Sequence, residues 1–383
     1  MKIYAVGGAI RDELLGLPVQ DRDWVVVGAT PETMLALGYK PVGRDFPVFL
    51  HPVTHEEYAL ARTERKTGPG YTGFAIHASP DVTLEQDLAR RDLTINAIAR
   101  DDAGRLIDPF GGIPDLQARQ LRHVSAAFAE DPVRILRVAR FAARFQHRFG
   151  FTVAPETLQL MQRMVEAGEV DALVAERVWT ELSRGLCEPD PSVLFRVLEE
   201  CHALPRLLPE LVPYWTRHGA AAARSVDCAA ARAAPLAVRF AAWIVPLVVP
   251  SGAGGHTLIS TLGTRLRLPH AVQDLTSLAC RLHAALHTRF AAGPEELLAL
   301  LEAGDGLRRP QRLQDLLAVM ACSENAQDTP PPASGDPLLR AQAAAATVDT
   351  AALARDASSP SAIAASIRAA RLAAIGQAFS RGA

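Results

Sequence analysis

The sequence predicts an α/β domain over roughly the first 140 residues, followed by helices almost to the C-terminus. Two observations indicate this architecture. Residues 1 to about 115 alternate short apolar runs with turns, which is typical of an α/β domain. From Asp131 onward the apolar residues recur at helical spacing. At 383 residues the chain is also too long for one ordinary core, so we expect two to four domains.

The first predicted elements are a strand, a glycine turn and a short helix. Residues 2–6 form an apolar run that predicts a short buried strand. The pair Gly7-Gly8 lets the backbone turn sharply and approach a ligand closely. Residues 9–16, which include Arg11, suit a short helix whose N-terminal amides point back at the turn. Such a turn is a natural seat for phosphate.

Two aspartates open the second predicted strand. Asp21 and Asp23 precede the apolar run Trp24-Val-Val-Val27, and residues two apart in a strand face the same side. Two carboxylates held that close are costly unless a cation neutralises them, and Mg²⁺ prefers carboxylate oxygen with water and phosphate. Taken alone, the pair is as readily explained as solvated residues at a strand start, because short motifs occur often by chance.

Three further clusters complete the predicted α/β domain. Residues 55–62 suit a strand that carries Glu57, and a glycine-rich loop follows at 64–74. The segment Arg90-Arg91-Asp92 with Asn96 combines adjacent guanidiniums with an acid and an amide, which suits triphosphate and ribose contacts. Residues 108–112 predict a tight glycine turn after a strand. Each cluster alone is better explained by surface ion pairs or turn residues.

The first long predicted helix carries an arginine stripe. Asp131-Pro132 has the pattern of a helix cap, and residues 133–149 are amphipathic. Arginines 134, 137, 140, 144 and 148 fall in an arc of roughly 120°. A solvated helix face is the usual explanation of such a stripe. Here no acids interleave with the arginines, so their mutual repulsion favours an anionic partner.

Composition and cysteine spacing limit the function classes. The formal net charge of −2 gives no global sign of nucleic-acid binding, so any polyanion site must be local. Five scattered cysteines without C-x-x-C spacing argue against a disulfide framework and a zinc site, and predict reduced thiols. The strongest apolar run, 236–249, is too short to cross a bilayer. We expect a soluble, cytoplasmic protein, without membrane contact, that is a monomer or weak homodimer.

Taken together, these motifs resemble the bacterial class II tRNA nucleotidyltransferases, the CCA-adding enzymes. The match covers residues 1 to about 210 closely and in order. The resemblance implies a polymerase β-like nucleotidyltransferase head followed by all-α neck, body and tail domains. The divisions expected are 1–140 for the head, 141–215 for the neck, 216–330 for a degenerate helical region, and 331–383 for a linker and helical tail.

The resemblance also implies roles for individual residues. Gly8 and Arg11 would bind triphosphate, and Asp21 and Asp23 would be the catalytic acids that hold two Mg²⁺. Glu57 matches a third acidic position less closely. Arg91 would contact nucleotide, with Asp92 and Asn96 nearby. In the E-D-x-x-R motif at Glu130, Asp131 and Arg134, the last two would act as a protein template that pairs with incoming CTP or ATP. The further nucleotide contacts implied on the same helix are Arg137 and Arg140.

The implied reaction is attack by the 3′-hydroxyl of a tRNA lacking CCA on the α-phosphorus of CTP or ATP. Poly(A) polymerases share the early motifs, but the intact E-D-x-x-R motif favours CCA addition. Relatives that add only two cytidines have a shortened loop, and the loop at 64–74 is full length. A non-catalytic RNA-binding protein is the alternative from another class, against which the intact acids argue.

One departure from the family concerns residues 216–330. Longer members carry a phosphohydrolase domain with a His-Asp pair after an R-F-A-A-like run. Here that run is present at Arg239-Phe-Ala-Ala-Trp243, but the pair falls on Val245-Pro246. Neither side chain can bind a divalent metal. The sequence therefore predicts that phosphatase and cyclic phosphodiesterase activities are absent.

Overall fold

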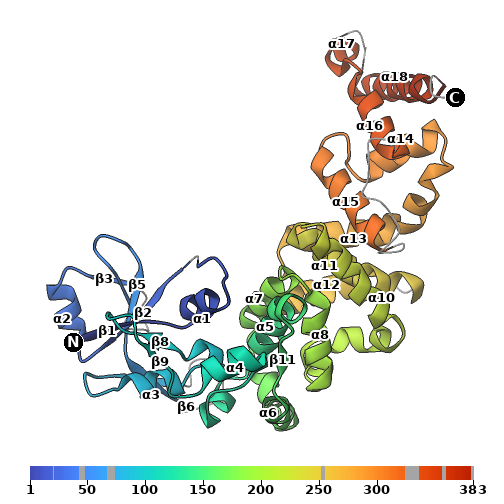
Figure 1. Cartoon of the computed structure of the whole chain (residues 1–383). Coiled ribbons are helices and arrows are strands. Elements are labelled where there is room, and N and C mark those ends of the chain that lie inside the picture. Colours follow the sequence, from blue (N-terminus) through green and yellow to red (C-terminus); the bar gives the residue numbers. More distant parts are fainter. Residues whose placement is uncertain are drawn as a thin grey trace. The chain divides into compact units, whose positions relative to one another are not determined.

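The computed structural model describes residues 1–19, 21–42, 48–66, 74–251, 255–323, 336–355 and 359–380. The chain divides into two compact units, Met1–Pro209 and Glu210–Ala383, and each is described by itself (Figure 1). The first unit contains the sheet and the second is built of helices, as the sequence predicts.

A seven-stranded sheet in the order β3-β4-β5-β2-β1-β8-β9 forms the base of the first unit. The strands are β1 (Lys2–Val6), β2 (Asp23–Val27), β3 (Lys40–Val42), β4 (Val48–Leu50), β5 (Glu57–Leu60), β8 (Ala99–Arg100) and β9 (Leu106–Ile107). Strands β2 and β5 run parallel, whereas the other neighbours are antiparallel. The register pairs Asp23 with Val6 on one side and with Glu57 on the other, so the glycine turn and two acids meet at one end of the sheet.

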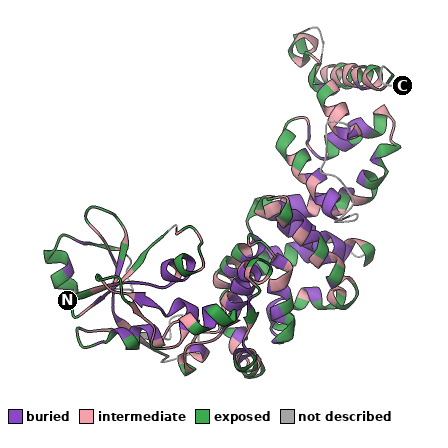
Figure 2. Cartoon of the chain, viewed as in Figure 1, coloured by how far each residue is buried: buried purple, intermediate pink, exposed green. Residues whose placement is uncertain are grey.

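Each face of this sheet has its own core, because neighbouring residues of a strand point to opposite faces. Val25 packs with Val6 and Leu88 on one face, while Val26 packs with Met34 and Phe49 on the other. Helices α2 (Pro31–Ala36) and α3 (Leu84–Ala89) contribute residues to these cores, and α1 (Gly8–Leu14) and α4 (Gly112–Ala118) are the other helices of this part of the chain. Figure 2 shows the buried residues along the central strands.

Helices follow the sheet within the first unit. They are α5 (Val133–Phe149), α6 (Pro155–Glu166), α7 (Ala175–Leu186), α8 (Pro191–Glu200) and α9 (Leu204–Leu207). Helix α5 coincides with the predicted arginine-striped helix, and it packs against α7 and α8. A short parallel pair, β10 (Gln120–Leu121) with β11 (Thr152–Val153), joins the segment before α5 to the segment after it.

Two predicted loops fall mainly outside the described residues. An antiparallel pair of strands, β6 (Arg62–Lys66) and β7 (Phe74–Ala78), flanks the glycine-rich loop. Residues 67–73, with all three glycines of that loop, are outside the description, as are residues 324–335 of the expected linker.

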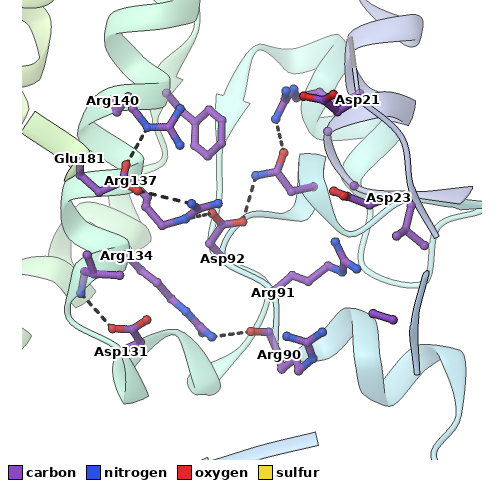
Figure 3. A pocket seen from close by; sticks show the side chains of 18 of the residues that line it. Asp21, Asp23, Arg90, Arg91, Asp92, Asp131, Arg134, Arg137, Arg140 and Glu181 are labelled. Carbon is purple, nitrogen blue, oxygen red and sulfur yellow. Dashed lines mark hydrogen bonds and ion pairs between the residues drawn. The ribbon is translucent and has the colours of Figure 1, made fainter. Parts of the chain in front are cut away.

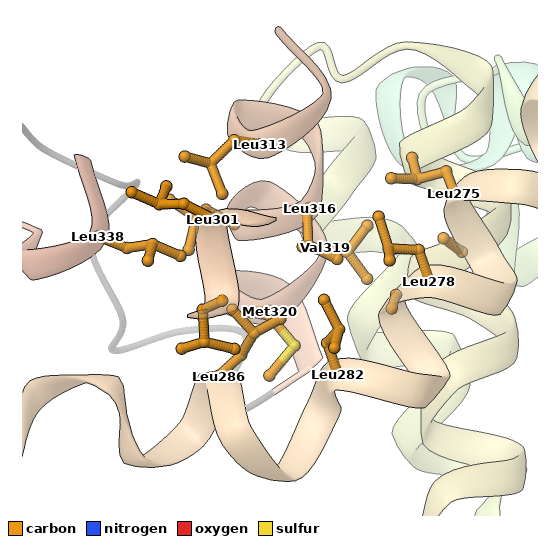
Figure 4. Packing of buried hydrophobic residues seen from close by; sticks show 14 of the residues in the cluster. Leu275, Leu278, Leu282, Leu286, Leu301, Leu313, Leu316, Val319, Met320 and Leu338 are labelled. Atoms are coloured by element: carbon orange, nitrogen blue, oxygen red, sulfur yellow. The ribbon is translucent and has the colours of Figure 1, made fainter. Parts of the chain in front are cut away.

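The second unit is helical wherever it is described. Its helices are α10 (Val212–Ala231), α11 (Leu236–Val248), α12 (Gly255–Leu266), α13 (His270–His287), α14 (Pro294–Ala303), α15 (Pro310–Ser323), α16 (Pro337–Ala346), α17 (Thr350–Arg355) and α18 (Pro360–Ser380). Leucines of α13 and α15 meet in its core (Figure 4). No helix in the described ranges is both long and apolar enough to span a bilayer.

Val245 and Pro246, the positions to which the family resemblance assigns the His-Asp pair, lie inside α11. Val245 and Pro246 are buried, and Val245 belongs to the hydrophobic core of the second unit. Their surroundings are therefore apolar, which is unfavourable for a divalent cation. Across the described residues, no three His, Cys, Asp or Glu side chains are grouped to hold a metal ion.

The expectation of reduced thiols is wrong for one pair of cysteines. Cys228 of α10 and Cys322 of α15 form a disulfide, with their Cα atoms 5.6 Å apart. The two residues are 94 positions apart in sequence, and the packing of α10 against α15 brings them together. Linear spacing cannot show such proximity. Cys187, Cys201 and Cys280 take no part in this disulfide.

Candidate active site

A pocket of about 880 Å³ lies in the first unit, where the end of the sheet faces α5 and α7 (Figure 3). Its size suits a small organic ligand such as a nucleotide. Every predicted site residue lines it: Gly8, Arg11, Asp21, Asp23, Arg91, Asp131, Arg134, Arg137 and Arg140. The fold thus brings together residues that span more than a hundred positions of sequence.

The glycine turn between β1 and α1 forms one wall. Gly7 has φ +74°, a left-handed conformation that favours glycine. A Cβ atom there would also lie 2.9 Å from Nη1 of Arg91 and 3.9 Å from Oδ2 of Asp23. The absence of a side chain therefore lets a guanidinium and a carboxylate approach the same turn.

Three exposed acids occupy the sheet end of the pocket. Asp23 begins β2, Asp21 precedes it by two residues, and Glu57 begins the neighbouring β5 in register with Asp23. Among the residues that the structure describes, these carboxylates have no hydrogen-bond or ion-pair partner. Unpartnered carboxylates fit a hard divalent cation, which takes one or two of them together with water and substrate phosphate. They do not form a three-ligand cage within the described chain.

Arg11 lies beneath the pocket with its donors turned toward the protein. Its side chain is 3% exposed, and Nε donates to Oδ1 of Asp12 at 2.8 Å. Nη1 donates to Asn96, and the guanidinium packs on the rings of Phe141 and Phe145. Burial lowers the pKa of Arg11, and Asp12 opposes that shift. Arg11 therefore joins the glycine turn to α5, besides lining the pocket.

Asp92 continues this network toward α5. Its Oδ1 accepts from Asn96 Nδ2 at 2.9 Å, and its Oδ2 accepts from Arg137 Nε at 2.8 Å. Burial alone would raise the pKa of Asp92, but Arg137 and these hydrogen bonds hold it well below its ordinary value. A continuous chain of polar contacts thus runs from Arg11 through Asn96 and Asp92 to Arg137.

Arg134 and Arg144 of α5 also have protein partners. Arg134 donates from Nη1 to the carbonyl of Ala127 at 2.7 Å and from Nη2 to the carbonyl of Arg90 at 2.6 Å. Arg144 donates from Nη2 to Asp12 at 3.0 Å. The acids that neutralise the stripe come from other elements, so helix repulsion alone does not require an external anion.

Helix α7 supplies site residues that the sequence reading does not single out. Arg177 binds both carboxylate oxygens of Asp131, at 2.9 and 2.7 Å. One turn later, Oε2 of Glu181 accepts from Nε of Arg140 at 2.7 Å, and its Oε1 lies 3.6 Å from Nη1 of Arg137 (Figure 3). The spacing of four residues places Arg177 and Glu181 on one helix face. That spacing is the one sequence signal for them, and it does not identify their partners.

The turn at Asp108 has a structural explanation. Asp108 accepts from the amides of Gly112 and Ile113 at 2.7 and 2.8 Å and so caps α4. Asp115 of α4 accepts from Thr94 Oγ1 at 2.7 Å. This cluster supports the segment that carries Asn96, and none of these three capping and supporting residues lines the pocket.

Two family models match separate parts of the first unit and its boundary. Residues 3–122 match the poly A polymerase head domain. Residues 150–214 match a probable RNA and SrmB-binding site of polymerase A. The first match covers the sheet with the glycine turn and the acids, and the second covers the helices after α5.

Individual relatives match almost the whole chain. The multifunctional CCA protein of Aromatoleum aromaticum is 52% identical over 98% of this chain and 98% of its own length. That of Cupriavidus pinatubonensis is 54% identical, over 93% and 92% respectively. Among solved structures, the Bacillus stearothermophilus CCA-adding enzyme in complex with CTP superposes with a TM-score of 0.71 at 25% identity, covering 99% of this chain and 93% of that one.

Proposed function

The chain belongs to the multifunctional CCA protein family, and we propose that its pocket adds C, C and A to the 3′ end of tRNA, with CTP and ATP as substrates. The observation that carries this proposal is the pocket itself. In one cavity it combines a glycine turn, acids without a partner among the described residues, and Asp131 with Arg134, the pair that we propose reads the base. A poly(A) polymerase is not favoured, because the relatives that span the chain are CCA proteins.

Within this proposal, one end of the pocket binds the triphosphate and the metal ions, and the other end binds the base. Gly7-Gly8 and Arg91 would receive the triphosphate, because the turn lacks side chains and the guanidinium lies against it. Asp21 and Asp23 would hold divalent metal ions, with Mg²⁺ as the ion we propose. When bound, such ions supply Lewis-acid activation of the 3′-hydroxyl and charge stabilisation of the leaving pyrophosphate. Asp131 and Arg134 would orient the base.

The extension assay uses purified protein, Mg²⁺, CTP and ATP with a tRNA transcript that lacks its CCA end, followed by sequencing of the product ends. We expect C, C and A and nothing further. Asp21→Ala removes one of two metal-binding carboxylates, so we expect turnover to fall by at least about a thousandfold while tRNA affinity is retained. A run of A would indicate a poly(A) polymerase. Equal activity of wild type and variant would contradict the role of Asp21.

We also propose that the second unit has no phosphohydrolase activity, because Val245 and Pro246 cannot ligate a metal. The fourfold division of the chain into head, neck, degenerate region and tail is part of the same proposal. Incubation with a 2′,3′-cyclic nucleotide and divalent metals tests the predicted absence of phosphohydrolase activity. Hydrolysis that survives Asp21→Ala would contradict that absence, since the variant disables only the first unit's acids.

A further inference from the structure

Asp87 of α3 is a buried acid to which the proposed function assigns no task. Its side chain has no exposed surface, and it does not itself line the pocket. A charge removed from solvent is unfavourable unless it is paired and hydrogen-bonded. Burial would raise the pKa of Asp87, but Arg90 and Arg91 outweigh it and lower that pKa below its ordinary value. The carboxylate is therefore ionised at neutral pH.

The first oxygen of Asp87, Oδ1, is held by its immediate surroundings. It accepts from Nε and Nη2 of Arg90 at 3.1 and 2.8 Å and from the backbone amide of Arg62 at 3.2 Å. Nε of Arg90 also donates to the carbonyl of Arg62 at 3.1 Å. The carboxylate therefore cannot rotate without breaking contacts to Arg90 and to the first residue of β6, so the direction of its second oxygen is fixed.

The second oxygen, Oδ2, faces the pocket residue Arg91. Nη2 of Arg91 donates to it at 3.3 Å, and among the described residues Asp87 is the one hydrogen-bond or ion-pair partner of this guanidinium. The other terminal nitrogen, Nη1, lies against the glycine turn, because a Cβ atom on Gly7 would be 2.9 Å from it. Asp87 thus holds one end of the guanidinium while the other end meets the turn.

This arrangement leaves donors of Arg91 for an anion. A guanidinium carries several N–H donors in a rigid plane, of which Asp87 takes one. The side chain of Arg91 is 18% exposed and lines the pocket, where Figure 3 shows it extending toward the side that holds Asp23. A donor group that is already oriented loses less freedom when a ligand binds, which favours binding. Asp23 approaches the same turn, so a released Arg91 could pair with that acid instead.

We propose that Asp87 is a positioning residue for the triphosphate, because its Oδ2 holds Arg91 against the glycine turn with donors directed at the incoming phosphates. This inference rests on the proposed function, in which Arg91 and the glycine turn receive the triphosphate. Asp87 does not touch the nucleotide itself and acts through Arg91.

Asp87→Asn separates the contact to Arg91 from the other contacts of Asp87. Asparagine has nearly the same shape, with one oxygen and one NH2 group. Because three donors from Arg90 and Arg62 surround Oδ1, the amide oxygen should take that place. The NH2 group then faces Nη2 of Arg91, where two donors repel. The variant therefore loses the contact to Arg91 and keeps those to Arg90 and Arg62.

The test measures how strongly pyrophosphate inhibits CTP addition at saturating Mg²⁺, since pyrophosphate carries phosphates and no base. We expect the inhibition constant for pyrophosphate and KM for CTP to rise about tenfold in Asp87→Asn, the effect of one charge-assisted hydrogen bond. The affinity for tRNA should not change. The matched control is Glu85→Gln, which removes a charge from an exposed position on the same helix and should match wild type.

A double variant separates positioning from a general structural role. Arg91→Met should raise the inhibition constant by itself, and adding Asp87→Asn should then cause no further rise, because Asp87 acts through the side chain already removed. Damage to the fold would instead add to the effect of Arg91→Met and weaken tRNA binding. An unchanged constant in Asp87→Asn, or effects that multiply in the double variant, would overturn the inference.

Two remaining outcomes are also decisive. If Asp87→Asn does not fold, Arg91→Lys decides, because lysine keeps the charge but cannot reach Asp87 and the turn at once. A raised inhibition constant in Arg91→Lys supports the inference, and a wild-type constant overturns it. If the wild-type protein does not add C, C and A, the proposed function fails and the inference fails with it. Failure of the inference alone leaves wild-type CCA addition intact.

Discussion

Asp92 is the group on which both ends of the pocket depend. It is 7% exposed and accepts from Arg137, Asn96 and the amide of Leu93. Asn96 in turn binds Arg11 beneath the glycine turn. One carboxylate therefore fixes a guanidinium on α5 and, through an amide, another on α1.

Asp92→Asn should weaken this network without removing its volume. The amide replaces one acceptor oxygen with an NH2 group, which cannot accept from Arg137, and leaves Glu181, 3.6 Å away, as the remaining acid beside that guanidinium. We expect the first unit to lose about 3 kcal/mol of unfolding free energy at pH 7 and KM for CTP to rise. Calorimetry and steady-state kinetics measure the two effects. If stability and KM are unchanged, the Asp92–Arg137 contact contributes neither to the unfolding free energy nor to CTP binding.

The pH dependence of that loss follows from the lowered pKa of Asp92. A carboxylate whose folded pKa lies below its unfolded value, near 3.8, contributes stability above that value. The contribution disappears as pH falls through the folded pKa. The stability difference between wild type and Asp92→Asn should therefore be constant from pH 7 to about 5 and shrink below about 4. If the stability difference between wild type and Asp92→Asn instead grows as the pH falls, the lowered pKa of Asp92 does not explain it.

At the residue scale, local motifs carry most of the predictive information. The sequence alone predicts the glycine turn and the proximity of Asp21 and Asp23, because their geometry follows from neighbouring residues. It does not predict the pairing of Arg177 with Asp131, because Asp131 lies 46 residues earlier. Only the packing of α7 on α5 brings them together.

Helix α5 illustrates the same limit for an element. Its bounds follow the predicted range, but the argument from repulsion among its arginines fails. The acids that compensate them, Asp12, Asp92 and Glu181, come from three other segments. A sequence window reveals charges within one helix and misses the charges that face it.

Helix α13 gives a prediction for the second unit. Burial, together with the neighbouring His287, lowers the pKa of His283 to about 4. The unfolded histidine, with a pKa near 6.5, takes up a proton first as pH falls. The contribution of His283 to stability is therefore full above about pH 6.5 and is lost as pH falls through 4.

His283→Gln should remove that pH dependence. We expect the unfolding free energy of the second unit in wild type to drop by about 1 to 2 kcal/mol more than in the variant between pH 7 and pH 4, after allowance for partial exposure. Urea unfolding at several pH values measures this. His270→Gln, at an exposed position on the same helix, is the control and should follow wild type. Parallel pH profiles for His283→Gln and wild type would show that half-buried His283 does not stabilise the second unit through a lowered pKa.

Across the whole molecule, the sequence predicts the order of architectures correctly, a sheet and then helices, because periodicity changes near Asp131. It does not predict the covalent link in the second unit. Cys228 and Cys322 belong to helices α10 and α15, which four other α-helices separate in the sequence, and they meet only when the bundle is assembled. Long-range pairing of this kind depends on tertiary packing, which scattered cysteines in a sequence do not encode visibly.

The disulfide predicts that the two units respond differently to reductant. Closing a loop of 94 residues should stabilise the second unit by about 4 kcal/mol. Cys228→Ala combined with Cys322→Ala should therefore lower the unfolding temperature of that unit. Reductant should have the same effect on wild type and no effect on the variant.

The first unit holds the pocket and contains neither cysteine of the disulfide, so CTP addition at 25 °C should persist. Calorimetry with and without dithiothreitol follows both transitions, with Cys187→Ala, which removes an exposed cysteine outside this disulfide, as control. If reductant leaves wild type unchanged, the bond does not stabilise the second unit.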